Sequence, residues 1–307
     1  MARDVLELMK LDPADVPEKL KAAYYFDFEA HPFAHSGLFG GRNARSIIDA
    51  IAGIEDYLKG ALAEAIGGAK VVTRKTQADF PGRCVGKFSV LLEEGAAFVP
   101  EFVVGGDSEA ATLYLASGAR LLGANVWLGD GSVAVGEGTM VEPGVGVKGP
   151  AIVGRENEIR QGAYLRGSVI TGDGCILRGE LKNTVIMDKG NFPHPSYLGD
   201  SLCGYETHFG NQATSANLGI LAVIERAPIV MEVDGRQYDL GRPKVGIIMG
   251  DYSQVGCNSV SDPATFLAPW TIVYQLTRLN RGFYGPAELI KNKPMEHGVI
   301  ERTPLRR

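Results

Sequence analysis

The hydrophobic pattern of this chain repeats every six residues over much of its length. The longest run at this spacing is unbroken and consists of Val135, Val141, Val147, Val153, Ile159, Leu165, Thr171 and Leu177. Shorter runs flank it: Leu122 and Leu128, one residue out of phase, then Cys203, Phe209 and Ser215, then Met249, Val255, Ser261, Leu267 and Val273. Six is neither the 3.6-residue period of an amphipathic helix nor the two-residue period of a half-buried strand.

A six-residue period is typical of one side of a β-solenoid coil, where a short strand is followed by a sharp turn and three sides complete the coil. The repeated aliphatic residue then points inward and stacks on its copy in the next coil. Glycine suits the corners because they need positive φ. The chain has 40 glycines in 307 residues, nearly twice the usual share of ~7%. We therefore predict a mainly β fold, a parallel β-helix over residues 113–276.

The flanking regions follow other patterns. Residues 1–70 are predicted to be a helical segment, because Asp12-Pro13 has the residue types of a helix start and one apolar face recurs at helical spacing. That face consists of Ile47, Ile48, Ile51, Ile54, Leu58 and Leu62. Residues 71–112 are predicted to be strands and loops that lead into the coils, and residues 277–307 a C-terminal tail.

Two interruptions of the period are expected to carry function, because solenoids place binding residues on excursions from their structural coils. The first is residues 183–197, where the phase shifts. The second is an insertion at residues 219–244. Within it, residues 229–240 predict a β-hairpin with a primed turn at Asp234-Gly235.

Charge and cysteine content narrow the function classes. The formal net charge of −5 argues against a nucleic-acid partner. The four cysteines are scattered and form no zinc or disulfide framework. The first ten residues lack the apolar run of a signal peptide, and no stretch of ~18 apolar residues predicts a membrane span. We expect a cytoplasmic protein with no membrane partner.

Motifs within the repeats are more specific than the repeats themselves. They are Lys182-Asn183, His194-x-x-Tyr197-x-Gly199-Asp200, Ala216-Asn217-Leu218 and, after the hairpin, Gly241-Arg242-Pro243-Lys244. Residues 113–276 thereby resemble the acetyltransferase domain of the bifunctional N-acetylglucosamine-1-phosphate uridylyltransferase/glucosamine-1-phosphate acetyltransferases, and still more the archaeal sugar-1-phosphate nucleotidylyltransferases. The resemblance implies a left-handed β-helix, a homotrimer, and acyl-CoA bound between subunits.

The resemblance also implies roles for individual residues. His194 would be the general base, Asn217 would hold the acceptor or the acyl group, and Tyr197 would contact the sugar. The substrate would further be bound by Arg166, Lys182, His208, Arg242 and Lys244, with the hairpin and residues 241–244 forming a lid. Acetyl-CoA, the implied co-substrate, would lie along Gly210, Asn211 and Cys257.

Some features depart from the family. No nucleotidylyltransferase domain is expected, because Leu38-Phe39-Gly40-Gly41-Arg42 follows no strand and is a poor match to a phosphate loop. The Arg166–Lys182 spacing is about two residues shorter than in the bacterial relatives. Asn211 and Gln212 replace small residues that let a thioester approach the backbone, and Cys257 replaces another.

The sequence therefore favours an acetyl-CoA-dependent N-acetyltransferase acting on an amino-sugar phosphate, and two alternatives stay open. One is a binding paralogue that keeps the sugar-phosphate or nucleotide-sugar site without catalysis. The other is an N-acyltransferase that uses a longer acyl chain. Only two histidines, His194 and His208, lie in the predicted coils, and two ligands do not make a zinc site. No metal is predicted.

Overall fold

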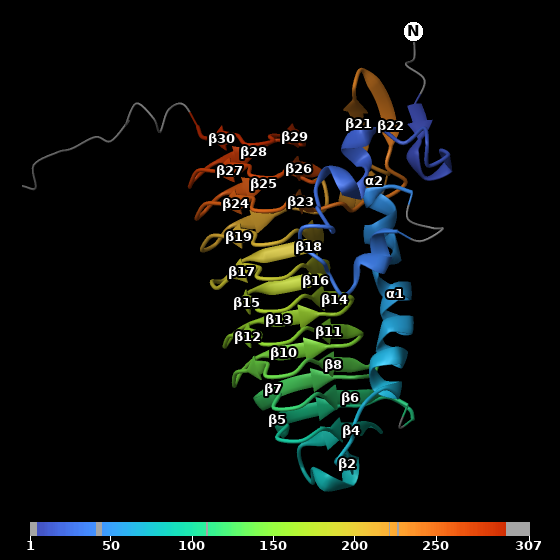
Figure 1. Cartoon of the computed structure of the whole chain (residues 1–307), viewed down its shortest axis with the longest axis vertical. Coiled ribbons are helices and arrows are strands. Elements are labelled where there is room, and N and C mark those ends of the chain that lie inside the picture. The colour runs from blue at the N-terminus through green and yellow to red at the C-terminus, as the bar shows by residue number, and fades with distance from the viewer. Residues whose placement is uncertain (1–4, 41–44, 109, 221, 226, 293–307) are drawn as a thin grey trace, which may run out of the picture.

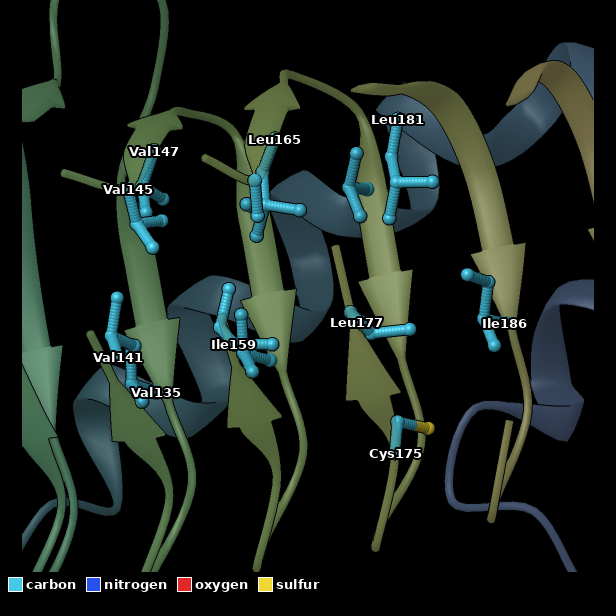
Figure 2. Close-up of a cluster of buried hydrophobic side chains, with 14 of the residues drawn as sticks. Val135, Val141, Val145, Val147, Ile159, Leu165, Cys175, Leu177, Leu181 and Ile186 are labelled. Atoms are coloured by element: carbon cyan, nitrogen blue, oxygen red, sulfur yellow. The ribbon is translucent and has the colours of Figure 1, made fainter. Parts of the chain in front are cut away.

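The computed structural model describes residues 5–40, 45–108, 110–220, 222–225 and 227–292. Its main body is a left-handed β-solenoid of about 11 turns. The six-residue period predicts the solenoid, and the family resemblance implies its left hand. The repeated residues from Val135 to Leu177 are each at most 2% exposed and line its interior. Figure 2 shows how these side chains stack from one coil to the next.

Each coil has three faces, defined here by their place in Figure 1 and by the helix that covers one of them. The front face consists of β3 (Cys84–Val85), β10 (Gly146–Lys148), β13 (Tyr164–Arg166), β20 (Thr214–Ser215), β25 (Val260–Ser261) and β28 (Arg278–Leu279). The covered face consists of β4 (Ser89–Leu92), β6 (Thr112–Leu115), β8 (Val133–Val135), β11 (Ala151–Val153), β14 (Val169–Thr171), β23 (Ile247–Met249), β26 (Thr265–Leu267) and β29 (Gly282–Tyr284). The side face consists of β9 (Met140–Val141), β12 (Glu158–Ile159), β15 (Ile176–Leu177), β17 (Asn191–Phe192), β19 (His208–Phe209), β24 (Gln254–Val255), β27 (Ile272–Val273) and β30 (Leu289–Ile290).

Four longer strands bend around a corner and belong to two faces. Side and front faces share β5 (Ala97–Val104) and β7 (Arg120–Trp127), and front and covered faces share β16 (Glu180–Ile186) and β18 (Tyr197–Cys203). Strands of successive coils pair in parallel, whereas β2 (Thr73–Thr76) pairs antiparallel with β4 at one end of the solenoid. The chain runs from covered to side to front face in every coil.

The solenoid is longer than the sequence pattern predicts. Its strands begin at Cys84 rather than at residue 113, and β28 to β30 extend it to Ile290. The early coils are not evident in the sequence because the loops at residues 105–108 and 128–132 interrupt the spacing of inward residues. The rest of the predicted tail, residues 293–307, lies outside the described residues.

The predicted helical segment is helical only in its last third. Helix α1 (Ile47–Gly67) begins with a capping box: Asp49 N donates to Ser46 Oγ (3.2 Å), and Ser46 N donates to the Asp49 carboxylate (2.8 Å). The helices among the described residues upstream are of the 3₁₀ type, at Leu8–Lys10, Glu18–Leu20, Ala22–Tyr24 and Ser36–Phe39, and a fifth 3₁₀-helix follows α1 at Gln77–Asp79. Prolines at 13, 17 and 32 explain the difference, because proline removes a backbone donor and disfavours helix before itself.

Helix α1 lies along the covered face (Figure 1). Its apolar face packs against the outward-pointing residues of that sheet. These residues are apolar, whereas the outward-pointing residues of a solvent-exposed sheet are polar. This second core joins Ile47, Ile48, Ile51, Ile54, Leu58 and Leu62 of α1 to Ala134, Ile152, Ile170, Val185 and Leu202 of the sheet. The helix therefore leaves the front and side faces bare and forms a wall beside the front–covered corner.

The insertion contains the predicted hairpin. Strands β21 (Val230–Val233) and β22 (Arg236–Asp239) pair antiparallel, and Asp234 (φ 49°) and Gly235 (φ 83°) form the primed turn. A short helix, α2 (Ala222–Glu225), precedes them, and β1 (Val5–Glu7) adds to β22 as a third strand. The apolar side of the hairpin joins the second core.

Candidate active site

The phase shift predicted to be an excursion is instead a set of shortened corners. Leu177 and Leu181 are four residues apart because the side–front corner between them is short. The next two front–covered corners each turn on a single left-handed residue, Asn183 (φ 48°) and Asp200 (φ 50°). These tight corners hold β16 and β18 together, so the residues on either side of them are fixed by regular strand pairing.

Two columns of side chains point outward from the front face, because neighbouring strand residues alternate between core and surface. The column beside the covered corner reads, coil by coil, Trp127, Lys148, Arg166, Lys182 and Gly199. The column beside the side corner reads Asn125, Gly146, Tyr164, Glu180, Tyr197 and Thr214. Three cations in successive coils thus occupy one line.

An open cleft of about 570 Å³ runs along the front–covered corner, with α1 as one wall. Five cationic and three acidic side chains line it: Lys148, Arg166, Lys182, Arg242 and Lys244, with Glu55, Asp130 and Asp200. Four of these cations are residues predicted to bind substrate. The fold therefore brings these four cations together, although they lie up to 78 positions apart in the sequence.

Asp200 organises the upper end of the cleft, although its side chain is only 7% exposed. Its carboxylate accepts hydrogen bonds from Asn183 (2.8 Å), Asn217 (2.7 Å) and Arg242 (3.0 Å). The Asn183 amide also donates to the carbonyl of Ile51 in α1 (3.3 Å). One buried carboxylate thus fixes the insertion and the predicted ligand Asn217, and through Asn183 it is linked to the helix.

The cations of the cleft differ in how they are neutralised. Lys148 pairs with Asp130 (2.5 Å) and Arg166 with Glu180 (2.5 Å), while Arg242 pairs with Asp200. Within the part of the chain that the structure describes, no ion pair is formed by the half-buried Lys182 or Lys244. Two uncompensated ammonium groups in a concave site attract an anion.

Tyr197 stands beside this cleft and bends over Gly199. A Cβ at position 199 would lie 2.5 Å from the Tyr197 hydroxyl and 2.6 Å from Asn217 Nδ2, so only glycine admits this arrangement. Burial, followed by the charges of Glu180 and Asp200, raises the pKa of Tyr197. The hydroxyl therefore keeps its proton and remains a hydrogen-bond donor.

His194 lies at the other edge of the front face, in the side–front corner between Phe192 and Leu198, and its side chain is exposed. The corner is held to the next coil by Gln212 N, which donates to Pro195 O (2.7 Å). His208, on the side face, is half-buried. Burial, and to a lesser degree the nearby charge of His194, lowers the pKa of His208.

The residues predicted to contact acyl-CoA lie in the same corner, in the coils that follow. A Cβ on Gly210 would come within 2.6 Å of Cys257 N, so these two coils meet in backbone contact. Cys257 is exposed, and Tyr274 and Leu276 beyond it are 45% and 51% exposed. The predicted acyl site and the cation cleft thus flank one front face, with Tyr197 between them.

The hairpin itself is not a lid, contrary to the prediction. Its apolar residues are buried against the second core, and of the residues predicted to form the lid only Arg242 and Lys244, from the turn that follows, line the cleft. Sequence reasoning also missed Asp200, Lys148 and Glu180 as parts of the site.

In the described residues no group of three or more His, Cys, Asp or Glu side chains is arranged to hold a metal. No described helix is long and apolar enough to cross a membrane.

Part of this chain is similar in sequence to known bifunctional proteins. A bifunctional sugar-1-phosphate nucleotidylyltransferase/acetyltransferase of Sulfurisphaera tokodaii is 28% identical over 182 residues, which are 53% of this chain and 44% of that protein. The predicted resemblance is confirmed. The bifunctional protein GlmU of Synechococcus elongatus is 28% identical over 166 residues, which are 52% of this chain and 30% of GlmU.

A third relative, the bifunctional protein GlmU of Methanococcus maripaludis, is 30% identical over 96 residues, 31% of this chain and 22% of that protein. No family model matches the chain. This chain thus spans less than half the length of these relatives.

Proposed function

We propose that this chain is a sugar-phosphate N-acyltransferase that transfers an acetyl group from acetyl-CoA to the amine of an amino-sugar phosphate. The observation that carries the proposal is the cation cleft, where Lys182 and Lys244 form no ion pair among the described residues, beside the front face that carries Tyr197 and, at its opposite edge, His194. The Sulfurisphaera tokodaii relative, which is named a bifunctional sugar-1-phosphate nucleotidylyltransferase/acetyltransferase, supports the same reaction class.

The residues suit the needs of acyl transfer to an amine. The phosphate of the acceptor would bind Lys182 and Lys244, which orients the sugar along the face toward Tyr197. The amine nitrogen would attack the thioester carbonyl carbon, the carbon–sulfur bond would break, and CoA would leave as the thiol. His194 would take the proton that the nitrogen loses, acting as general base, and would pass it to the departing sulfur, which gives the CoA thiol.

The binding-paralogue alternative is favoured by one observation, the corner formed by Asn211 and Gln212. Asn211 is half-buried and its carbonyl accepts from Asn258 N (2.9 Å), so it is fixed in the corner where small residues are expected. The two functions differ in a simple respect: a binding paralogue would hold the sugar phosphate without releasing CoA from acetyl-CoA.

We expect that replacing both Lys182 and Lys244 by alanine raises the Kd for an amino-sugar phosphate by roughly 10²–10⁴-fold at low ionic strength, because each of the two lost charge-assisted contacts contributes about 1.5–3 kcal/mol. The effect should shrink as salt screens the cleft. Isothermal titration with glucosamine 1-phosphate at two salt concentrations measures it. Lys10→Ala, an exposed lysine outside the cleft, is the control. If the double variant and the wild type bound the sugar phosphate with equal affinity, the phosphate would not bind in this cleft.

We also expect a homotrimer. The front and side faces carry no covering layer among the described elements, and they meet at the corner that holds His194. Near this corner Val260, Tyr274 and Leu276 expose 43–51% of their surface, an apolar patch typical of an interface. Sedimentation velocity at micromolar concentration should give three times the mass of the chain, and a stable monomer would argue against an active site shared between subunits.

A further inference from the structure

The line of cations on the front face continues below the residues that a sugar monophosphate needs. Lys148, Arg166 and Lys182 stand in neighbouring coils, and strands of neighbouring coils lie about 4.8 Å apart. Like charges stacked at this spacing repel one another. Asp130 and Glu180 offset two of them, and an anionic ligand that extends along the line would offset the third, Lys182.

An aromatic pair stands at the lower end of this line. The rings of Trp127 and Tyr164 lie 6.1 Å apart between centroids, on either side of the coil that contributes Gly146. A Cβ at Gly146 would lie 3.0 Å from the Tyr164 ring and 3.4 Å from the Trp127 ring. Both rings therefore lean over a bare glycine. They are partly exposed and directly border Lys148 and Arg166.

From bottom to top the front face thus presents an aromatic shelf, three cations, and then Tyr197 with Asn217. The strand of Trp127 and the strand of Gly199 are four coil steps apart, about 19 Å. A hexosamine 1-phosphate bound at Lys182 would occupy only the upper part of this span. The lower part has the chemistry that a diphosphate followed by a planar base requires, since bases stack on aromatic side chains.

We propose that the sugar acceptor is carried on a nucleoside diphosphate, with its base on Trp127 and Tyr164, its diphosphate along Lys148, Arg166 and Lys182, and its sugar beneath Tyr197. This inference rests on the proposed function and names the substrate class for the same site. The amine of the sugar then lies toward the corner that holds His194. A free sugar phosphate would lack the lower half of these contacts.

The two tryptophans of the chain allow a direct test. In a Trp270→Phe variant, Trp127 is the only tryptophan, and an aromatic ring still faces Tyr252, on which Trp270 stacks with 4.2 Å between centroids. Its emission should change on titration with uridine diphosphate N-acetylglucosamine or ADP-glucose and stay constant with glucosamine 1-phosphate. In a Trp127→Phe variant, the emission of Trp270 should not respond to these nucleotide sugars.

A Trp127→Leu variant measures the contribution of the shelf to affinity. Its Kd for the nucleotide sugar that binds the wild type should rise about tenfold, the order expected for one base–aromatic stack, while the Kd for glucosamine 1-phosphate stays unchanged. Unchanged affinity for both nucleotide sugars would overturn the proposal. So would a Trp127 signal that only coenzyme A evokes, because the shelf would then serve the acyl donor.

The two proposals can fail separately. If glucosamine 1-phosphate is acetylated but no nucleotide sugar binds, the nucleotide inference is wrong and the acyltransferase function stands. If nucleotide sugars bind through Trp127 and no acceptor is acylated, the nucleotide-binding face is supported and the acyltransferase function is wrong.

Discussion

His194→Ala is expected to lower kcat by about 10²–10⁴-fold, the usual contribution of a general base. The Kd for the sugar phosphate should stay near that of the wild type, because His194 lies at the opposite edge of the front face from the cation cleft. Steady-state kinetics and titration of the same preparation separate these two effects. The acidic limb of the kcat/KM profile should also disappear in the variant.

His208→Gln is the matched control for this variant. Burial lowers the pKa of His208, so its imidazole stays neutral to a lower pH than it would in water. The variant should keep the acidic limb that His194→Ala loses. A His194→Ala enzyme that matches the wild type in kcat would exclude His194 as the base.

Asp200→Ala is expected to lower the free energy of unfolding by about 3–5 kcal/mol, the cost of removing one partner of a buried charge pair. The variant leaves Arg242 without its partner and removes the acceptor of Asn183 and Asn217. Denaturant unfolding measures the loss, and the Kd for the sugar phosphate should rise because Asn217 and Arg242 are no longer fixed.

Asp56→Ala is the control for stability, because Asp56 pairs with Lys59 on the exposed side of α1 and exposed ion pairs contribute little. If Asp200→Ala were as stable as the wild type, Asp200 would not be the residue that organises the upper cleft. If it were destabilised but bound sugar phosphate normally, its role would be confined to the fold.

The solenoid could be predicted from sequence because each side of a coil must place one side chain in a narrow core. Inward-pointing residues therefore repeat every six positions, a period that neither an amphipathic helix nor a half-buried strand has. The prediction was wrong where corners change length. At Asn183 and Asp200 a single residue adopts the left-handed conformation that glycine usually supplies, so the altered phase suggests an excursion where the strands in fact continue.

The candidate site was predictable only in part. The motifs include Lys182, Tyr197, Asp200 and Asn217 along the chain, but they do not indicate that the Asp200 carboxylate joins three segments. Asp200 acts through Asn183, Asn217 and Arg242, which come from three separate segments, and a local motif does not show which distant residues its carboxylate binds. Helix α1 lies beside the cleft because it packs on the one solenoid face whose outward-pointing residues are apolar. That face can be recognised only when the register of the coils is known.

The pairing of Trp127 with Tyr164 has the same origin. The two residues lie 37 positions apart in the sequence. Strand register places them two coils apart, in the two neighbouring columns of the front face, with Gly146 in the coil between them. Sequence periodicity describes the inward residues well because they repeat. The outward residues do not repeat, and their neighbours follow from the register alone.

The central claim, acyl transfer to an amino sugar held by its phosphate, is tested most directly by release of CoA from acetyl-CoA in the presence of glucosamine 1-phosphate or its uridine diphosphate derivative. The purified chain is assayed with each acceptor, alongside the Lys182→Ala/Lys244→Ala double variant. We expect acceptor-dependent release of CoA thiol, formation of the N-acetyl sugar, and a large drop in kcat/KM for the double variant. No acceptor-dependent release with any amino-sugar phosphate, although the wild type binds it, would contradict the account and leave a binding protein.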